Sequence, residues 1–203
     1  ITIQEDDFFN TWINGSDYQQ YVTLTKEERF NYGSVFYNLS KSVHPPLYHL
    51  IILTLYSFFP GGINKWYGLS LNLLLFLLCQ LMLYLVAAKI TGSRIVALSC
   101  IFLWGFGTSA INNVLFIRMY VLFTLFVLLF IYFSYRLFTS EKHSKGDITG
   151  LFLSIFLGSL TQHYFLIYCF FLTYLLAVNL VLLKKYGQLL QLILTTFLGV
   201  VFS

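Results

Sequence analysis

The amino-acid sequence predicts an all-α, polytopic bundle of transmembrane helices. Hydrophobic residues make up 58% of the 203 residues and charged residues only 10%, whereas water-soluble domains carry about a quarter charged residues. A spanning helix needs about 20 mostly apolar residues, so the chain has room for roughly six or seven crossings and one polar segment. This composition excludes a water-soluble globule, a disordered chain, a secreted disulfide scaffold and a nucleic-acid-binding module.

The charged residues divide the chain into two parts. Residues 1–46 hold six acids and three bases, and residues 47–203 hold nine bases and two acids, so an acidic polar head precedes a basic, apolar body. We predict that residues 1–65 form an extracytoplasmic loop or cap, and that residues 66–203 form a transmembrane bundle of about six helices. The chain begins at Ile1 without a methionine and stops inside an apolar run, so we expect it to be truncated at both ends.

The first apolar segment, Leu47–Phe59, is too short for an ordinary crossing. Pro45 and Pro46 precede it, and proline suits the first turn of a helix. We favour an interfacial helix over 47–59 that lies in the plane of the membrane, because this orientation keeps residues 1–65 together outside the cytoplasm. The alternative is a crossing helix, which would place residues 1–46 in the cytoplasm.

The elements of the bundle follow the uncharged stretches, which end at charged residues or at glycine and asparagine breaks. Gly105, Gly107 and the pair Asn112-Asn113 are expected to separate two helices. The predicted helices cover Trp66–Ala88, Ile95–Ser109, Val114–Tyr135, the two halves of Ile148–Leu183 divided near Thr161–His163, and a segment that begins after residues 184–187.

Basic residues predict the orientation of this bundle through the positive-inside rule. Seven bases fall in three alternate loops, whereas Lys65 and Arg118 lie on the other side. We therefore expect a multi-pass protein of the cell membrane, in contact with membrane lipids, whose residues 141–147 are part of a solvated cytoplasmic loop. The three loops predicted to be cytoplasmic are 89–94, 136–147 and 184–188.

A run of proline and imidazole side chains marks the boundary between the head and the body. In His44-Pro45-Pro46-Leu47-Tyr48-His49, the prolines fix the backbone and hold two imidazoles and a phenol at the depth of the lipid headgroups. A rigid turn with interfacial aromatic anchors explains the same pattern equally well. Both interpretations stay open on these residues alone.

Arg118 and His163 are the other polar candidates on the predicted outer side. Arg118 stands next to Tyr120 at the edge of an apolar helix, where an ionisable group is costly unless it reaches the interface or pairs. Its planar guanidinium suits a phosphodiester, and a structural ion pair or a bound phospholipid would suit it too. His163 and Tyr164 begin another apolar segment, where a lone histidine is more often a hydrogen-bonded structural group than a catalyst.

Carboxylates are required if the protein transfers a group to a hydroxyl, because a hydroxyl is a weak nucleophile without a base. Asp6, Asp7 and Asp17 are the candidates, although a polar cap would carry acids in any case. The three cysteines lie in apolar runs without metal or disulfide spacing and are predicted to be core thiols. The sequence predicts no metal site, no cofactor and no nucleic-acid partner.

Four motifs follow one another along the chain: His44-Pro45-Pro46-Leu47-Tyr48, Phe59-Pro60-Gly61 with Lys65-Trp66, Arg118-Met119-Tyr120, and His163-Tyr164-Phe165. In this order they resemble bacterial membrane glycosyltransferases of the GT-C superfamily. The nearest group is similar to protein O-mannosyltransferases and lipid A aminoarabinose transferases, which are family 39-like proteins. The resemblance covers nearly the whole chain.

This resemblance implies a polyprenyl-phosphate sugar donor and an acceptor outside the cytoplasm, which is a cell-envelope glycan, a lipid or a protein. It implies that Arg118 holds the donor phosphate. Relatives generally place their essential acid in an Asp-Glu-like pair after a preceding transmembrane helix, so the base is expected upstream of Ile1 or among the three aspartates. The residues expected to line the substrate pocket are His44, Pro45, Pro46, Tyr48, His49, Tyr120, His163 and Tyr164.

Two other functions compete with the transferase. A transporter or flippase for a lipid-linked glycan predicts paired charges near the bilayer midplane and broken central helices. A non-catalytic membrane scaffold of the same fold predicts no activity. The sequence favours the transferase because its polar residues lie at the predicted helix ends.

Overall fold

A computed structural model describes Trp12 and residues 14–16, 23–39, 44–59, 64–140 and 144–203. Within these ranges the chain is helical and forms no strand, which confirms the predicted all-α class. The helices are α2 (Tyr32–Leu39), α3 (Leu47–Phe58), α4 (Lys65–Thr91), α5 (Arg94–Gly105), α6 (Thr108–Leu115), α7 (Tyr120–Thr139), α8 (Lys145–Ser159), α9 (Tyr164–Leu182) and α10 (Tyr186–Val201).

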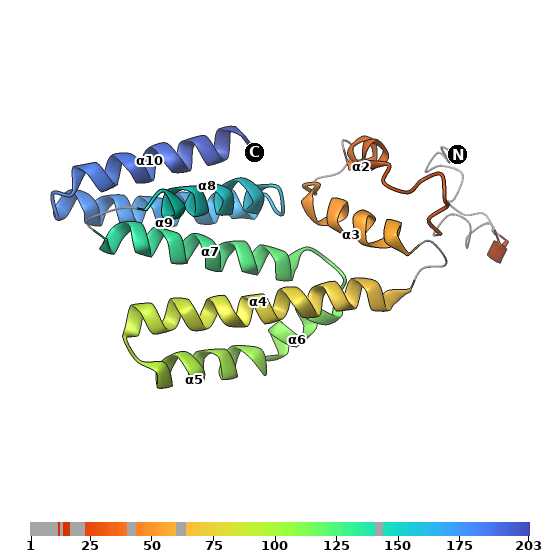
Figure 1. The fold of residues 1–203 in the computed structure, drawn as a ribbon, viewed down its shortest axis with the longest axis horizontal. Coiled ribbons are helices and arrows are strands. Elements are labelled where there is room, and N and C mark those ends of the chain that lie inside the picture. The colour runs from red at the N-terminus through yellow and green to blue at the C-terminus, as the bar shows by residue number, and fades with distance from the viewer. Residues whose placement is uncertain (1–11, 13, 17–22, 40–43, 60–63, 141–143) are drawn as a thin grey trace.

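Helix α7 lies between two groups of helices (Figure 1). It packs against α4, which carries α5 and α6, and on its other side against α8, which lies beside α9 and α10. In its apolar stretch 44% of the residues are buried, compared with 22% in α4 and 17% in α9. Helix α7 is therefore the centre of the packing, and most of α9 is left exposed.

Three helices, α4, α7 and α9, are long and apolar enough to cross a membrane. Helices α5 and α6 together make a fourth candidate span if they count as one segment, bent by 57°. Helices α8 and α10, with 15 and 16 residues, are shorter and pack beside the long helices. The described residues thus have the features of a membrane protein, with fewer full-length spans than the sequence predicts.

The break between α5 and α6 differs from the prediction. The predicted helices end at Ser109 and begin again at Val114, but α5 ends at Gly105 and the two asparagines lie inside α6. A Cβ atom on Gly105 would collide with the side-chain nitrogen of Gln80 on α4, and a Cβ on Gly107 would lie 3.1 Å from the carbonyl oxygen of Trp104. The span therefore bends at the glycines, and the asparagines lie within the second of the two helices.

Apart from the break between α5 and α6, the connections from α4 to α10 lie at two opposite ends of the bundle (Figure 1). We call the end that holds the start of α4 and the connections 116–119 and 160–163 the pocket end. The basic end holds the α4–α5 and α9–α10 connections, the end of α7 and the start of α8. Six of the seven bases that the sequence assigns to one side lie here, and the seventh, Lys142, is outside the described residues. The alternation predicted by the charge pattern is therefore present in the fold.

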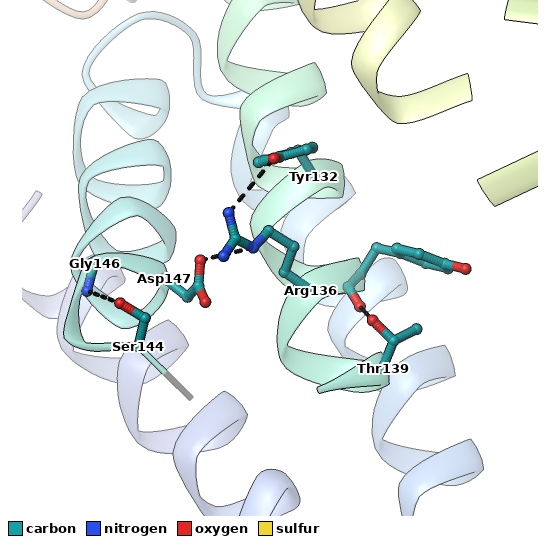
Figure 2. Close-up of polar contacts among 7 residues, drawn as sticks. Tyr132, Arg136, Thr139, Ser144, Gly146 and Asp147 are labelled. Carbon is teal, nitrogen blue, oxygen red and sulfur yellow. Dashed lines mark hydrogen bonds and ion pairs between the residues drawn. The ribbon is translucent and has the colours of Figure 1, made fainter. Parts of the chain in front are cut away.

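Arg136 and Asp147 join α7 to α8 at the basic end (Figure 2). The Nε atom of Arg136 lies 2.9 Å from a carboxylate oxygen of Asp147, and the guanidinium stands over the ring of Tyr132. Asp147 is only 4% exposed and lies in the first turn of α8, after the capping residue Ser144. The prediction that residues 141–147 form a solvated loop is therefore wrong at Asp147, because its charge pairs with an arginine one helix away. Residues 141–143 lie outside the described ranges.

Replacing the aspartate in D147N should lower the free energy of unfolding by about 1–3 kcal/mol, because a buried charge-assisted hydrogen bond is lost while the half-exposed arginine keeps its contact with water. Unfolding in detergent, followed by circular dichroism, measures the change. Lys145→Ala in the same turn is the control, because Lys145 is exposed. Equal stability of D147N and the wild type would contradict a stabilising role for the pair.

Close packing at Gly158 fixes α9 against the end of α8. A Cβ atom at this position would lie 2.5 Å from the ring of Phe165, which is fully buried. Gly187, at the start of α10, has nothing within 4 Å of the same position. The position of Gly158 is therefore closely packed, whereas the position of Gly187 has room for a side chain.

Gly158→Ala should cost about 1–3 kcal/mol of stability, because overpacking forces the Phe165 ring to move. Gly187→Ala should leave stability unchanged or raise it slightly. Thermal unfolding of both variants in the same detergent makes the comparison. A Gly158→Ala protein as stable as Gly187→Ala would show that α9 is not held at this contact.

Candidate functional site

A pocket of about 520 Å³ opens at the pocket end of the bundle. Its walls come from α2, from the segment before α3, from the connection between α8 and α9, and from the end of α10. Most of the wall is apolar, and the polar side chains are two imidazoles and two hydroxyls. The lining residues are Phe36, Leu39, His44, Pro45, Pro46, Ser159, Leu160, His163, Leu166 and Ser203.

Two segments far apart in the sequence meet at this pocket. The backbone N–H of Leu47, at the start of α3, donates to the carbonyl oxygen of Leu160, 3.0 Å away, at the end of α8. The end of a helix leaves carbonyl groups without partners, so this bond satisfies one of them. It also brings the turn that carries His44 next to the turn that carries His163.

The structure thus unites four of the predicted pocket residues: His44, Pro45, Pro46 and His163. Pro46 precedes the first residue of α3 with a helical φ of −81°, as expected for a proline at a helix start. His163 holds the equivalent place before α9. Both imidazoles are exposed, so they are accessible to a ligand in the pocket.

Arg118, Tyr120 and Tyr164 do not line this pocket. Arg118 lies in the connection between α6 and α7 and is exposed, and within the described ranges its side chain makes no hydrogen bond or ion pair. Tyr164 is 68% exposed at the start of α9. All three residues lie at the pocket end of the bundle, but their side chains do not line the pocket.

Tyr48 and His49 are also absent from the pocket wall. Tyr48 is buried and its hydroxyl donates to the side-chain oxygen of Asn72, 3.0 Å away. Burial raises the pKa of Tyr48 to about 12, so the phenol stays protonated and remains a donor. His49 is half-buried, and burial lowers the pKa of its imidazole below the usual value. Its Nδ1 atom has no hydrogen-bond partner in the part of the chain that the structure describes.

The cap residues after position 23 hold α2 in place over α3. The Nε atom of Arg29 donates to the carbonyl oxygen of Ser57, and the backbone N–H of Phe30 donates to the hydroxyl of the same serine. The hydroxyls of Tyr32 and Thr54 lie 3.1 Å apart. These bonds attach the cap to the outer surface of α3, so α2 supplies Phe36 and Leu39 to the pocket.

The predicted catalytic aspartates Asp6, Asp7 and Asp17 lie outside the described residues. Among the described residues, no group of three or more histidine, cysteine or acidic side chains is placed to hold a metal ion. Cys79 and Cys169 are buried, as predicted for core thiols, and Cys100 is half-buried. The pocket can therefore offer hydrogen bonds from imidazoles and hydroxyls inside an apolar wall.

Sequence reasoning missed Asn72, which is fully buried. Its side chain contacts α3 and the end of α6, so it joins the two segments in which Tyr48 and Arg118 lie. The available signal was a carboxamide side chain within an apolar spanning segment, where polar side chains form bonds between helices.

Comparisons with models of protein families, with curated proteins and with solved structures found no match for this chain.

The two ends of the bundle should face opposite sides of the membrane. In a Cys100→Ser background, His163→Cys should react with a membrane-impermeant maleimide on intact cells, because the pocket end is predicted to face outward. Lys184→Cys at the basic end should react only after permeabilisation. Both positions are exposed, and the remaining native thiols are buried. The reverse labelling pattern would contradict the predicted orientation.

Proposed function

We propose that this protein is a membrane glycosyltransferase of the GT-C type, which transfers a sugar from a polyprenyl-phosphate donor to an acceptor outside the cytoplasm. One observation carries the proposal: His44, Pro45, Pro46 and His163, which the resemblance assigns to the substrate pocket, line one cavity. The cavity lies at an end of the bundle, where a donor with its lipid tail in the bilayer can present its phosphate and sugar. A mostly apolar concave pocket with a few polar groups is the usual form of a ligand site.

Arg118 supports the proposal as the phosphate ligand. Its side chain is exposed at the pocket end and has no partner among the described residues, so it is available for an anionic group. A guanidinium binds phosphate oxygens with two parallel hydrogen bonds. As the sugar leaves the donor, this contact stabilises the negative charge that develops on the phosphate.

The reaction is a single displacement that inverts the sugar's anomeric centre. The acceptor oxygen forms a bond to C1 of the sugar while the bond between C1 and the phosphate oxygen breaks, and polyprenyl phosphate leaves. The proton of the acceptor hydroxyl passes to a carboxylate, for which Asp6, Asp7 and Asp17 are the candidates. His44 and His163 hydrogen-bond the sugar hydroxyls and orient the ring.

Arg118→Ala should lower transfer by about 10²–10³-fold, the effect of removing one group that stabilises a developing anion. Transfer of radiolabelled mannose and aminoarabinose from their polyprenyl-phosphate donors, measured with the full-length protein in detergent, gives the rate. His163→Ala should lower the rate through weaker sugar binding.

Lys65→Ala is the matched control for Arg118→Ala, because Lys65 is an exposed base at the same end outside the pocket. Size-exclusion chromatography of each variant tests whether the protein remains folded. Undiminished transfer by a folded Arg118→Ala protein would refute the role of this arginine. Absence of transfer by the wild type would favour the non-catalytic scaffold.

A transporter or flippase is the second candidate, because the span formed by α5 and α6 is bent by 57°. Broken helices are typical of transporters. The side chain of Gln80 faces this break. Its Oε1 atom is buried and has no hydrogen-bond partner among the described residues. Movement of a labelled polyprenyl-phosphate sugar across proteoliposomes without an acceptor would support this candidate over the transferase.

A further inference from the structure

Asn72 occupies a fully buried position in the first third of α4. Its side-chain oxygen accepts a hydrogen bond from the hydroxyl of Tyr48, and its side-chain nitrogen donates to the carbonyl oxygens of Val114 at 3.1 Å and Phe116 at 2.8 Å. A carboxamide buried without partners costs several kcal/mol in an apolar environment. Here three bonds satisfy it.

These bonds join two segments that the sequence singles out separately. Tyr48 belongs to the first turn of α3, directly after the two prolines of the pocket wall. Val114 and Phe116 lie at the end of α6, whose last carbonyl groups lack partners within the helix. The Phe116 carbonyl also accepts the backbone N–H of Arg118 at 2.7 Å.

The same carbonyl oxygen therefore receives one bond from α4 and one from the residue proposed to hold the phosphate. Ile117 packs against Gly68, which lies one helical turn before Asn72 on α4. A Cβ atom on Gly68 would lie 2.5 Å from a methyl group of Ile117. The connection between α6 and α7 is thus held to α4 by both polar and apolar contacts. Of these contacts, the hydrogen bonds of Asn72 also connect to α3, through the hydroxyl of Tyr48.

We propose that Asn72 is a positioning residue, which sets the place of Arg118 relative to the histidine-bearing turn before α3. This inference rests on the proposed function in one respect, namely that Arg118 binds the donor phosphate. Neither a carboxylate nor an apolar side chain can replace the amide, because the site needs two donated bonds and one accepted bond from a single group.

Asn72→Leu should lower kcat/KM for the polyprenyl-phosphate donor by about tenfold or more, because small displacements of a positioned group are costly. Tyr48→Phe should lower it by about threefold, the effect of one neutral hydrogen bond. In an Arg118→Ala background, Asn72→Leu should cause little further loss, because the group that it positions is already absent. Full additivity of the two losses would overturn the inference.

Asn179→Leu on α9 is the matched control. This asparagine lies in another apolar helix, is exposed, and donates to the Leu175 carbonyl of its own helix. Its replacement should leave kcat/KM unchanged. If Asn72→Leu fails to fold, Tyr48→Phe tests the same network with its packing retained, and its loss should likewise vanish in the Arg118→Ala background.

A distance measurement separates failure of the inference from failure of the proposed function. Spin labels at Phe58→Cys and Phe116→Cys, both exposed positions, report the separation of α3 and the α6–α7 connection in a Cys100→Ser protein. The distribution should broaden or shift in Asn72→Leu and to a lesser degree in Tyr48→Phe. An unchanged distribution overturns the inference whether or not transfer occurs. If Asn72→Leu changes the distribution but the wild-type protein shows no transfer, the coupling of α3 to the α6–α7 connection through Asn72 stands. Only the proposed transferase function is then refuted.

Discussion

The hydrogen bonds of the Asn72 carboxamide are the interaction on which the arrangement of the pocket end depends. A short helix such as α3 buries few residues and has little contact with the long helices, so apolar packing alone does not fix its position. The bond from Tyr48 to Asn72 gives it one specific anchor, and the bond from Leu47 to the end of α8 gives it another. The bond between Tyr48 and Asn72 is buried inside the bundle, where no water is available to replace either partner. Because the two anchors are directional, they set the orientation of α3. Helix α3 in turn holds the cap, whose helix α2 supplies Phe36 and Leu39 to the pocket wall.

At the basic end, a different pair of polar side chains joins the helices. Arg136 and Asp147 neutralise each other between α7 and α8, and Gln188 on α10 donates to the carbonyl oxygen of Ser140 at the end of α7. These contacts attach the second group of helices to the central one. The middle of the bundle is held mainly by the packing of aromatic and aliphatic side chains around Phe130 and Phe165, which are fully buried. Specific polar contacts at both ends and apolar packing between them give each helix a defined register.

The pocket has apolar walls and two exposed imidazoles, while the exposed arginine lies outside the wall, on a separate connection. A ligand that uses both must extend from the pocket towards the start of α7. A lipid-linked sugar has this form, because its phosphate separates a polar ring from a long apolar tail. The relative position of α3 and the α6–α7 connection therefore matters more for such a ligand than the shape of the pocket alone.

The residues and their order predicted much of the helical layout and only part of the site. Uncharged stretches bounded by charges located α4, α7 and α9 to within a few residues at most ends, and the spacing of bases predicted which connections lie together. The sequence predicts a break between Ser109 and Val114, whereas α5 ends at Gly105, against which the Gln80 side chain of α4 lies. The sequence predicts a solvated position for Asp147, because nothing local to it shows that Arg136 lies across from it. His44 and His163, which the sequence marks as separate candidates, lie in the wall of one pocket, and their role in a substrate site stays a prediction.

The sequence by itself determined that this is an all-α chain with membrane-spanning features, since hydropathy and charge are properties of each segment alone. The tertiary structure decided which polar groups meet: Asn72 with Tyr48 and the end of α6, Arg136 with Asp147, and His44 with His163 in one wall. The physical reason is that a polar side chain in an apolar helix must find a partner, but its identity depends on which helix faces it. Only the packing of the helices supplies that information.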